Sequence, residues 1–91
     1  MDSNKESGYG RYDLVFKTPA VRNGKVIILE FKITKDAQKL EAKCDEALKQ
    51  IENKKYAAPF ISEGYSSIRK YGISFYNQEC MVKQGEMYVR E

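Results

Sequence analysis

The chain has 91 residues, which is enough for one small domain. Its 42% hydrophobic and 32% charged residues are typical of a globular protein and argue against a disordered one. A formal net charge of +3 permits a polyanionic partner without requiring one. Because the chain contains no histidine, His-ligated zinc sites and Ser-His catalysis are excluded, and a bound metal would need oxygen ligands.

The sequence also bears on location and on the cysteines. No apolar run approaches the roughly 18 residues of a membrane span, and no secretory signal follows Met1. We therefore expect a cytoplasmic protein with no membrane partner. Cys44 and Cys80 lie far apart without a paired spacing, so we interpret both as buried free thiols.

Two strands and a turn open the predicted domain. Residues 12–17 alternate apolar and more polar side chains, which predicts a strand with one apolar face. Residues 25–33 predict a second strand, and the intervening Pro19 and Asn23-Gly24 predict a turn. Because the connection is short, the two strands should form an antiparallel hairpin.

A long helix follows the hairpin. Thr34 or Asp36 can cap a helix that runs to about Lys54. Apolar residues recur at helical spacing and predict one buried stripe: Ala37, Leu40, Cys44, Ala47, Leu48 and Ile51. Pro59 and Gly64 mark a connector after this helix.

Two more strands complete the expected sheet. Residues 69–76 alternate as a third strand, and Asn77-Gln78 turns the chain into a fourth strand at 79–84. A strand-helix-strand crossover predicts that the third strand lies parallel to the second. The expected fold is therefore α/β (α+β-like), a mixed four-stranded sheet with one long crossover helix on one face.

One face of the second strand changes character along its length. Val26 and Ile28 are followed on the same face by Glu30 and Lys32, which lie about 7 Å apart near the carboxyl end of the strand. An acid and a base in this position usually form a solvated surface with weak ion pairs. The same pair can also belong to a reactive site.

The register of the hairpin decides what lies beside Glu30. If Lys17 pairs with Val26, Asp13 lies opposite Glu30, whereas a tighter turn puts Lys17 there and makes a salt bridge. In the first register two carboxylates about 5 Å apart repel by roughly 3 kcal/mol at an effective dielectric constant of 20. A hard cation bound by Asp13, Glu30 and a strand carbonyl relieves this repulsion. Lys32 could then orient or deprotonate a metal-polarised water beside a phosphate.

The order Asp13, Glu30-Phe31-Lys32, on a hairpin before a long helix and a parallel strand, resembles the PD-(D/E)XK nuclease superfamily. The stretches GRYDLVF, ILEFKI, ALKQIENKKY and KYGISFY are similar to one branch of it. That branch is the C-terminal nuclease-like domain often found behind an AAA-ATPase-like domain in bacterial proteins. The likeness extends over residues 10–83.

The resemblance implies a restriction-endonuclease-like core at residues 10–85. The polar composition of the first residues predicts a flexible N-terminal tail at 1–9, and a C-terminal tail is expected at 86–91. This core usually begins with a helix that supplies a further acid. Only eleven residues precede Tyr12, so the leading helix is expected to be absent, and Glu6 is a poor substitute for its acid. Either the chain is a fragment of a longer protein, or the fold is minimal and dimerises to cover its open face.

The resemblance also implies roles for individual residues. Asp13 and Glu30 would bind Mg²⁺ or Mn²⁺, and Phe31 would offer its main-chain carbonyl to the same metal. Lys32 matches the catalytic lysine. A departure is Tyr12, which stands where the superfamily often has a proline before the aspartate.

Gln50 and Tyr56 resemble a helix motif that some members of the superfamily place beside the active site. Their spacing differs from the usual form of that motif. Gln50 falls at the border of the apolar stripe, beside Lys43 and Lys54. The resemblance implies a catalytic role for Gln50, and the alternative is an exposed polar helix flank.

The function implied by these matches is metal-dependent hydrolysis of phosphodiester bonds in DNA. The expected partners are nucleic acid, with DNA favoured, and either a second copy or an upstream AAA-ATPase-like domain. One alternative is a nuclease-fold module that binds nucleic acid or another domain without cleavage. Another is a structural domain in which Glu30 and Lys32 form an interdomain salt bridge.

Overall fold

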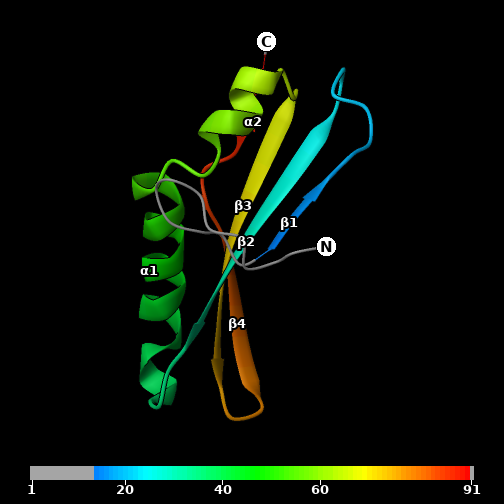
Figure 1. Cartoon of the computed structure of the whole chain (residues 1–91). Coiled ribbons are helices and arrows are strands. Elements are labelled where there is room, and N and C mark those ends of the chain that lie inside the picture. The colour runs from blue at the N-terminus through cyan, green and yellow to red at the C-terminus, as the bar shows by residue number, and fades with distance from the viewer. Residues whose placement is uncertain (1–13, 91) are drawn as a thin grey trace.

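A computed structural model describes residues 14–90 of the chain. A long helix crosses one face of a mixed five-stranded sheet, whose central order is β1-β2-β3-β4, with β5 paired to β3 (Figure 1). The elements are β1 (Leu14–Lys17), β2 (Lys25–Ile33), a 3₁₀ turn (Ala37–Lys39), α1 (Leu40–Asn53), α2 (Ala58–Glu63), β3 (Ser67–Tyr76), β4 (Glu79–Gln84) and β5 (Tyr88–Val89). This is the mixed α/β, restriction-endonuclease-like architecture that the sequence predicts.

The β1–β2 hairpin is antiparallel, and its register pairs Lys17 with Val26. The Gly24 amide donates to the Val21 carbonyl at 2.7 Å and closes the predicted turn. The alternative register, with Lys17 opposite Glu30, is therefore wrong. Asp13 lies outside the described residues.

The helix begins later than predicted. The Asp36 carboxylate accepts a hydrogen bond from the Gln38 amide at 2.9 Å and caps a 3₁₀ turn that precedes α1. Ala37 is exposed in this turn, so its place in the buried stripe is wrong, and Leu48 is only partly buried. The rest of the predicted stripe is buried: Leu40, Cys44, Ala47 and Ile51.

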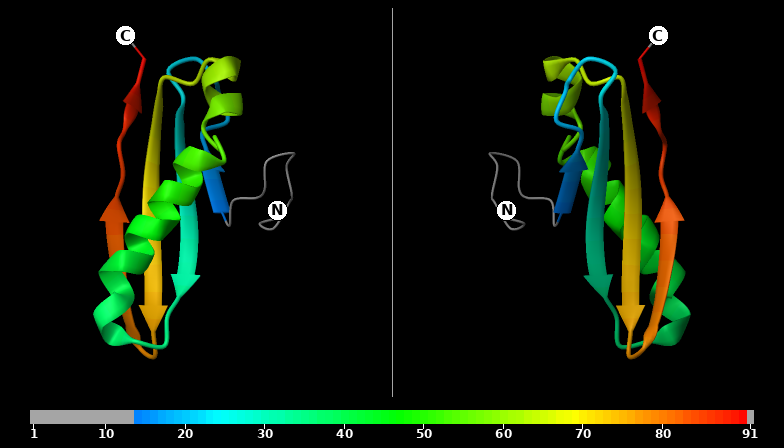
Figure 2. Two further views of the ribbon diagram at one scale, coloured as in Figure 1. Left: turned by 90° about the vertical axis from the view of Figure 1, so that its left-hand side faces the viewer. Right: turned by 90° about the vertical axis from the view of Figure 1, so that its right-hand side faces the viewer.

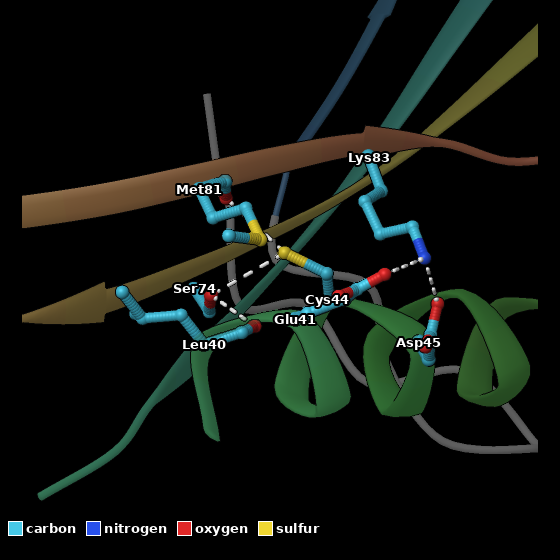
Figure 3. A network of polar contacts seen from close by, with 7 residues as sticks. All are labelled: Leu40, Glu41, Cys44, Asp45, Ser74, Met81 and Lys83. Atoms are coloured by element: carbon cyan, nitrogen blue, oxygen red, sulfur yellow. Dashed lines mark hydrogen bonds and ion pairs between the residues drawn. The ribbon is translucent and has the colours of Figure 1, made fainter. Parts of the chain in front are cut away.

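The start of α1 packs against β3 and β4, as the left-hand view of Figure 2 shows. A Cβ atom at Gly72 would lie 2.4 Å from the Cys44 carbonyl oxygen, so the glycine permits a close approach of helix and strand. The Ser74 hydroxyl donates to the Leu40 carbonyl at 2.6 Å, and the Cys44 thiol donates to the Met81 carbonyl at 3.2 Å (Figure 3). These contacts fix the position of α1 on the sheet.

The hydrophobic core lies where the amino halves of β2 and β3 meet α1 and α2. Val26, Ile28 and Ile68 are fully buried on the strands. The Phe60 and Tyr65 rings meet edge to face, with centroids 6.0 Å apart. The strands β2 and β3 are parallel, as the crossover predicts.

Two elements were not predicted. The connector after α1 contains the short helix α2, which has Pro59 in its first turn and ends at Gly64 in a left-handed conformation. The strand β5 lies within the stretch assigned to a C-terminal tail, and its Tyr88 packs against the core. Both α2 and β5 are short, so neither has a long periodic pattern.

The cysteines are only partly as predicted. Both are free thiols, and Cys44 is buried, but Cys80 is exposed on β4. Its predicted burial is therefore wrong. Within residues 14–90, none of the helices has the length and apolar character needed to cross a membrane.

Candidate active site

The carboxyl half of β2 places an acid and a lysine on the sheet face that α1 covers. Glu30 is 4% exposed and Lys32 is half-buried, and both follow Val26 and Ile28 on this face. The strand β1 pairs with β2 only as far as Leu29 within the described residues. The charged half of β2 therefore begins where the described hairpin ends.

Gln50 of α1 bonds both charged residues. The Lys32 ammonium donates to the Gln50 amide oxygen at 2.6 Å, and the Gln50 amide nitrogen donates to a Glu30 carboxylate oxygen at 2.7 Å. Because an ammonium can only donate and a carboxylate can only accept, these contacts determine which way the amide faces. The structure thus brings together three of the residues predicted for the site.

Tyr56 joins this cluster despite its unusual distance from Gln50 along the chain. Its hydroxyl lies 3.4 Å from the Gln50 amide nitrogen. After α1 the chain reverses: Lys55 adopts φ +56°, its amide donates to the Glu52 carbonyl, and the Tyr56 amide donates to the Ile51 carbonyl. This is a Schellman ending, and it folds Tyr56 back over the last turn of α1. The reversal explains how a six-residue spacing brings both side chains together.

Two small residues of β3 lie beside the charged pair and were not predicted as part of the site. Gly72 pairs with Glu30 and Ser74 pairs with Lys32 in the parallel register. Since Gly72 allows α1 close to the sheet, it brings Gln50 within reach of β2. A glycine inside a predicted strand was the available signal for this close approach.

The donor atoms of the site suit a hard cation. Glu30 offers a carboxylate, and Phe31 offers the main-chain carbonyl that the resemblance implies; oxygen donors are those that Mg²⁺ and Mn²⁺ prefer. Within residues 14–90 no cluster of three or more Asp, Glu, Cys or His side chains could hold a metal. The second predicted acid, Asp13, lies outside the described residues, so the described part supplies only a portion of the predicted ligand set.

A separate charged cluster lies over α1 and β4. The Lys83 ammonium contacts Asp45 at 2.8 Å and Glu41 at 3.1 Å (Figure 3). The hydrogen bonds that the Lys83 ammonium donates to Asp45 and, with a smaller effect, to Glu41 raise the pKa of Lys83 above its usual 10.5. These side chains are substantially exposed, and the cluster joins α1 to β4 rather than contributing to the Glu30 site.

A mixed sheet with a crossover helix, and with an acid and a lysine two residues apart on its second strand, defines a restriction-endonuclease-like domain. A family model described as the PD-(D/E)XK nuclease superfamily matches residues 1–85, and the chain belongs to this superfamily. No curated protein and no solved structure matches the chain.

Proposed function

We propose that the protein is a Mg²⁺-dependent nuclease that hydrolyses phosphodiester bonds of DNA. The observation that carries the proposal is the partly buried Gln50 bridge, which joins the buried Glu30 carboxylate and the Lys32 ammonium on one face of β2. A merely solvated surface pair would not need a buried acid and a helix side chain that contacts both partners. Membership of a nuclease superfamily supports the same conclusion.

In this proposal Asp13, Glu30 and the Phe31 carbonyl hold the metal. The observed pairing of Lys17 with Val26 is the register for which the sequence predicts Asp13 opposite Glu30. Bound there, Mg²⁺ would supply positive charge to the attacking water and the phosphate. Lys32 orients the water or exchanges a proton with it at Nζ.

Gln50 acts in the proposal as a positioning residue. Its amide holds the Lys32 ammonium and the Glu30 carboxylate at a fixed separation. Tyr56 in turn lies against the same amide and limits its movement. Contacts that fix the geometry of the reacting side chains before the substrate binds favour the reaction.

The branch of the superfamily, the partner domain, the domain bounds and the cellular location are also part of the proposal. The stretches GRYDLVF and ILEFKI support a place in the branch found behind AAA-ATPase-like domains of bacterial proteins. An upstream domain of that kind is then a partner, the nuclease domain spans residues 10–85, and the protein acts in the cytoplasm.

Calorimetric titration with Mn²⁺ tests the metal site. We expect Glu30→Gln to lose binding while its circular dichroism stays that of the wild type, because glutamine keeps the shape but not the charge. Asp13→Asn should lose binding as well. The matched control is Glu46→Gln, which removes an exposed carboxylate of α1 and should leave binding unchanged. Wild-type binding by the Glu30→Gln variant would refute the metal assignment.

Cleavage of supercoiled plasmid DNA and of a labelled single strand tests the chemistry. We expect Lys32→Met to retain Mn²⁺ binding and to lower the cleavage rate by about 100-fold or more. The control Lys49→Met removes an exposed lysine of α1 and should cleave at the wild-type rate. Equal rates for the wild type and Lys32→Met would remove Lys32 from the mechanism. Metal binding without cleavage of either DNA would favour the non-catalytic alternative.

A further inference from the structure

The sheet face opposite α1 is apolar and uncovered in the described chain. In the right-hand view of Figure 2 the sheet lies in front of α1, and none of the helices of residues 14–90 crosses this face. Alternation along the strands and pairing across them place Phe16, Ile33, Phe75, Val82 and Val89 here. These are five of the seven exposed large hydrophobic residues of residues 14–90, the other two being Ile61 and Met87.

The exposure of this face is unusual for a single folded chain. Ile33 is 80% exposed, and Val82 and Val89 are each 54% exposed. Phe31 and Phe75 form a ring contact on the same face, with centroids 5.9 Å apart. A contiguous apolar patch of this kind marks an interaction surface.

The size of the face fits a pair of identical surfaces. The described strands of the sheet have four, nine, ten, six and two residues, and each strand residue covers roughly 16 Å², about 3.3 Å along the strand by about 4.8 Å across it. The flat area of the face is then roughly 500 Å² on each copy, or about 1,000 Å² for two. That value is the size of a weak interface that forms and dissociates with protein concentration.

The charges on the face also permit self-association. Its basic side chains, Lys25 and Arg69, lie near the amino ends of β2 and β3, whereas Ile33 and Phe75 occupy the carboxyl ends. When the strands of two copies run in opposite directions, the basic end of each copy lies over the carboxyl end of the other, so the two basic ends are far apart. A second copy can therefore cover the face without bringing like charges together, because the long Lys25 and Arg69 side chains can extend to water at its ends.

We propose that a second copy of this chain packs on the open face and makes a sheet-on-sheet dimer. Two sheets pack face to face at about 10 Å, with their side chains interdigitating. Glu30 and Lys32 lie on the opposite face, so both candidate sites of the dimer point outward. The proposal is independent of the nuclease function.

Sedimentation velocity of the full chain over a range of concentrations tests the proposal. The wild type should approach twice the chain mass of 10.5 kDa as its concentration rises. Val82→Glu buries a charge at the interface and should shift the chain to the monomer, with a dissociation constant raised at least about 100-fold. The matched control Met87→Glu changes an exposed apolar residue beyond β4, outside the five that form the face, and should leave the dimer intact.

The exposed thiol of Cys80 offers a second readout that does not depend on any interface variant. Cys80 pairs with Phe75, so its side chain lies on the open face, whereas Cys44 is buried. Alkylation of Cys80 should slow about tenfold or more as the protein concentration rises through the dimerisation range. A monomer at every concentration with constant alkylation, or a dimer that Val82→Glu and Met87→Glu weaken equally, would overturn the proposal. Mn²⁺ binding by a folded Val82→Glu monomer would show that the metal site does not depend on the dimer.

Discussion

The two halves of the covered sheet face are built by the same strand and the same helix, yet they have different contents. In the amino half, Val26 and Ile28 of β2 pack with apolar side chains of the core. In the carboxyl half, Glu30 and Lys32 meet the Gln50 amide. Burial alone therefore does not distinguish a core from a site, because Glu30 is nearly as buried as its apolar neighbours.

The difference shows where the domain gains and where it loses stability. Removing apolar side chains from water stabilises the fold by roughly 25 cal/mol per Å². Burial of a carboxylate works in the opposite direction unless hydrogen bonds or charges compensate for the lost hydration. Gln50 supplies one such hydrogen bond to Glu30, at 2.7 Å. A chain selected for stability alone would continue the apolar pattern of β2, so the polar half indicates a function.

The largest expected effect is on the apolar half. Ile68→Ala removes a fully buried side chain of β3 and should lower the free energy of unfolding by about 3 kcal/mol, through lost burial and the cavity that remains. Urea denaturation monitored by circular dichroism measures this. The control Ile61→Ala truncates a side chain that is 39% exposed and should cost clearly less. Equal losses in both variants would mean that the core is not where the structure places it.

A smaller effect is expected where the two halves meet α1. Gly72→Ala places a Cβ atom 2.4 Å from the Cys44 carbonyl oxygen, so the helix backbone has to move, at a cost of about 1 to 3 kcal/mol. Movement of α1 should also weaken the Gln50 bridge and lower Mn²⁺ affinity. Urea denaturation and calorimetry measure the two effects.

Gly85→Ala is the matched control for this variant. Its Cβ atom would meet the tip of the Leu48 side chain at 2.8 Å, and a flexible side chain can rotate away. We therefore expect a smaller loss of stability and unchanged Mn²⁺ affinity. If both glycine variants behave alike, close backbone packing at Gly72 does not position the site.

The sequence predicted the long elements because their patterns repeat over many residues. Both β2 and β4 have the predicted bounds. The length of the turn left two registers of the hairpin open, and the structure has the one that pairs Lys17 with Val26. The short α2 and β5 lack such repeats and depend on tertiary contacts with the core. These elements were not predicted because six and two residues are too few to show a helical or strand period.

The site could be predicted only in part, and for a related reason. Glu30 and Lys32 stand out because they interrupt an apolar strand, and Gln50 stands at the border of an apolar stripe. Tyr56 reaches Gln50 only through the left-handed Lys55, a conformation that the lysine itself does not signal. The distance between β3 and α1 likewise depends on Gly72, and this distance cannot be predicted from the spacing of the site residues along the chain.

The smallest effect is expected at the rim of the helix-covered face, where Lys83 contacts Asp45 and Glu41. Its pKa is raised above 10.5 in the folded state, so its contribution to stability is complete below the unfolded pKa and is lost as the pH rises through the folded pKa. Lys83→Gln should therefore lower the melting temperature slightly near neutral pH and have no effect at strongly alkaline pH. High salt should also reduce the difference, because exposed charges are screened. Lys49→Gln is the control, and a difference that persists at alkaline pH would show that Lys83 acts through packing instead of charge.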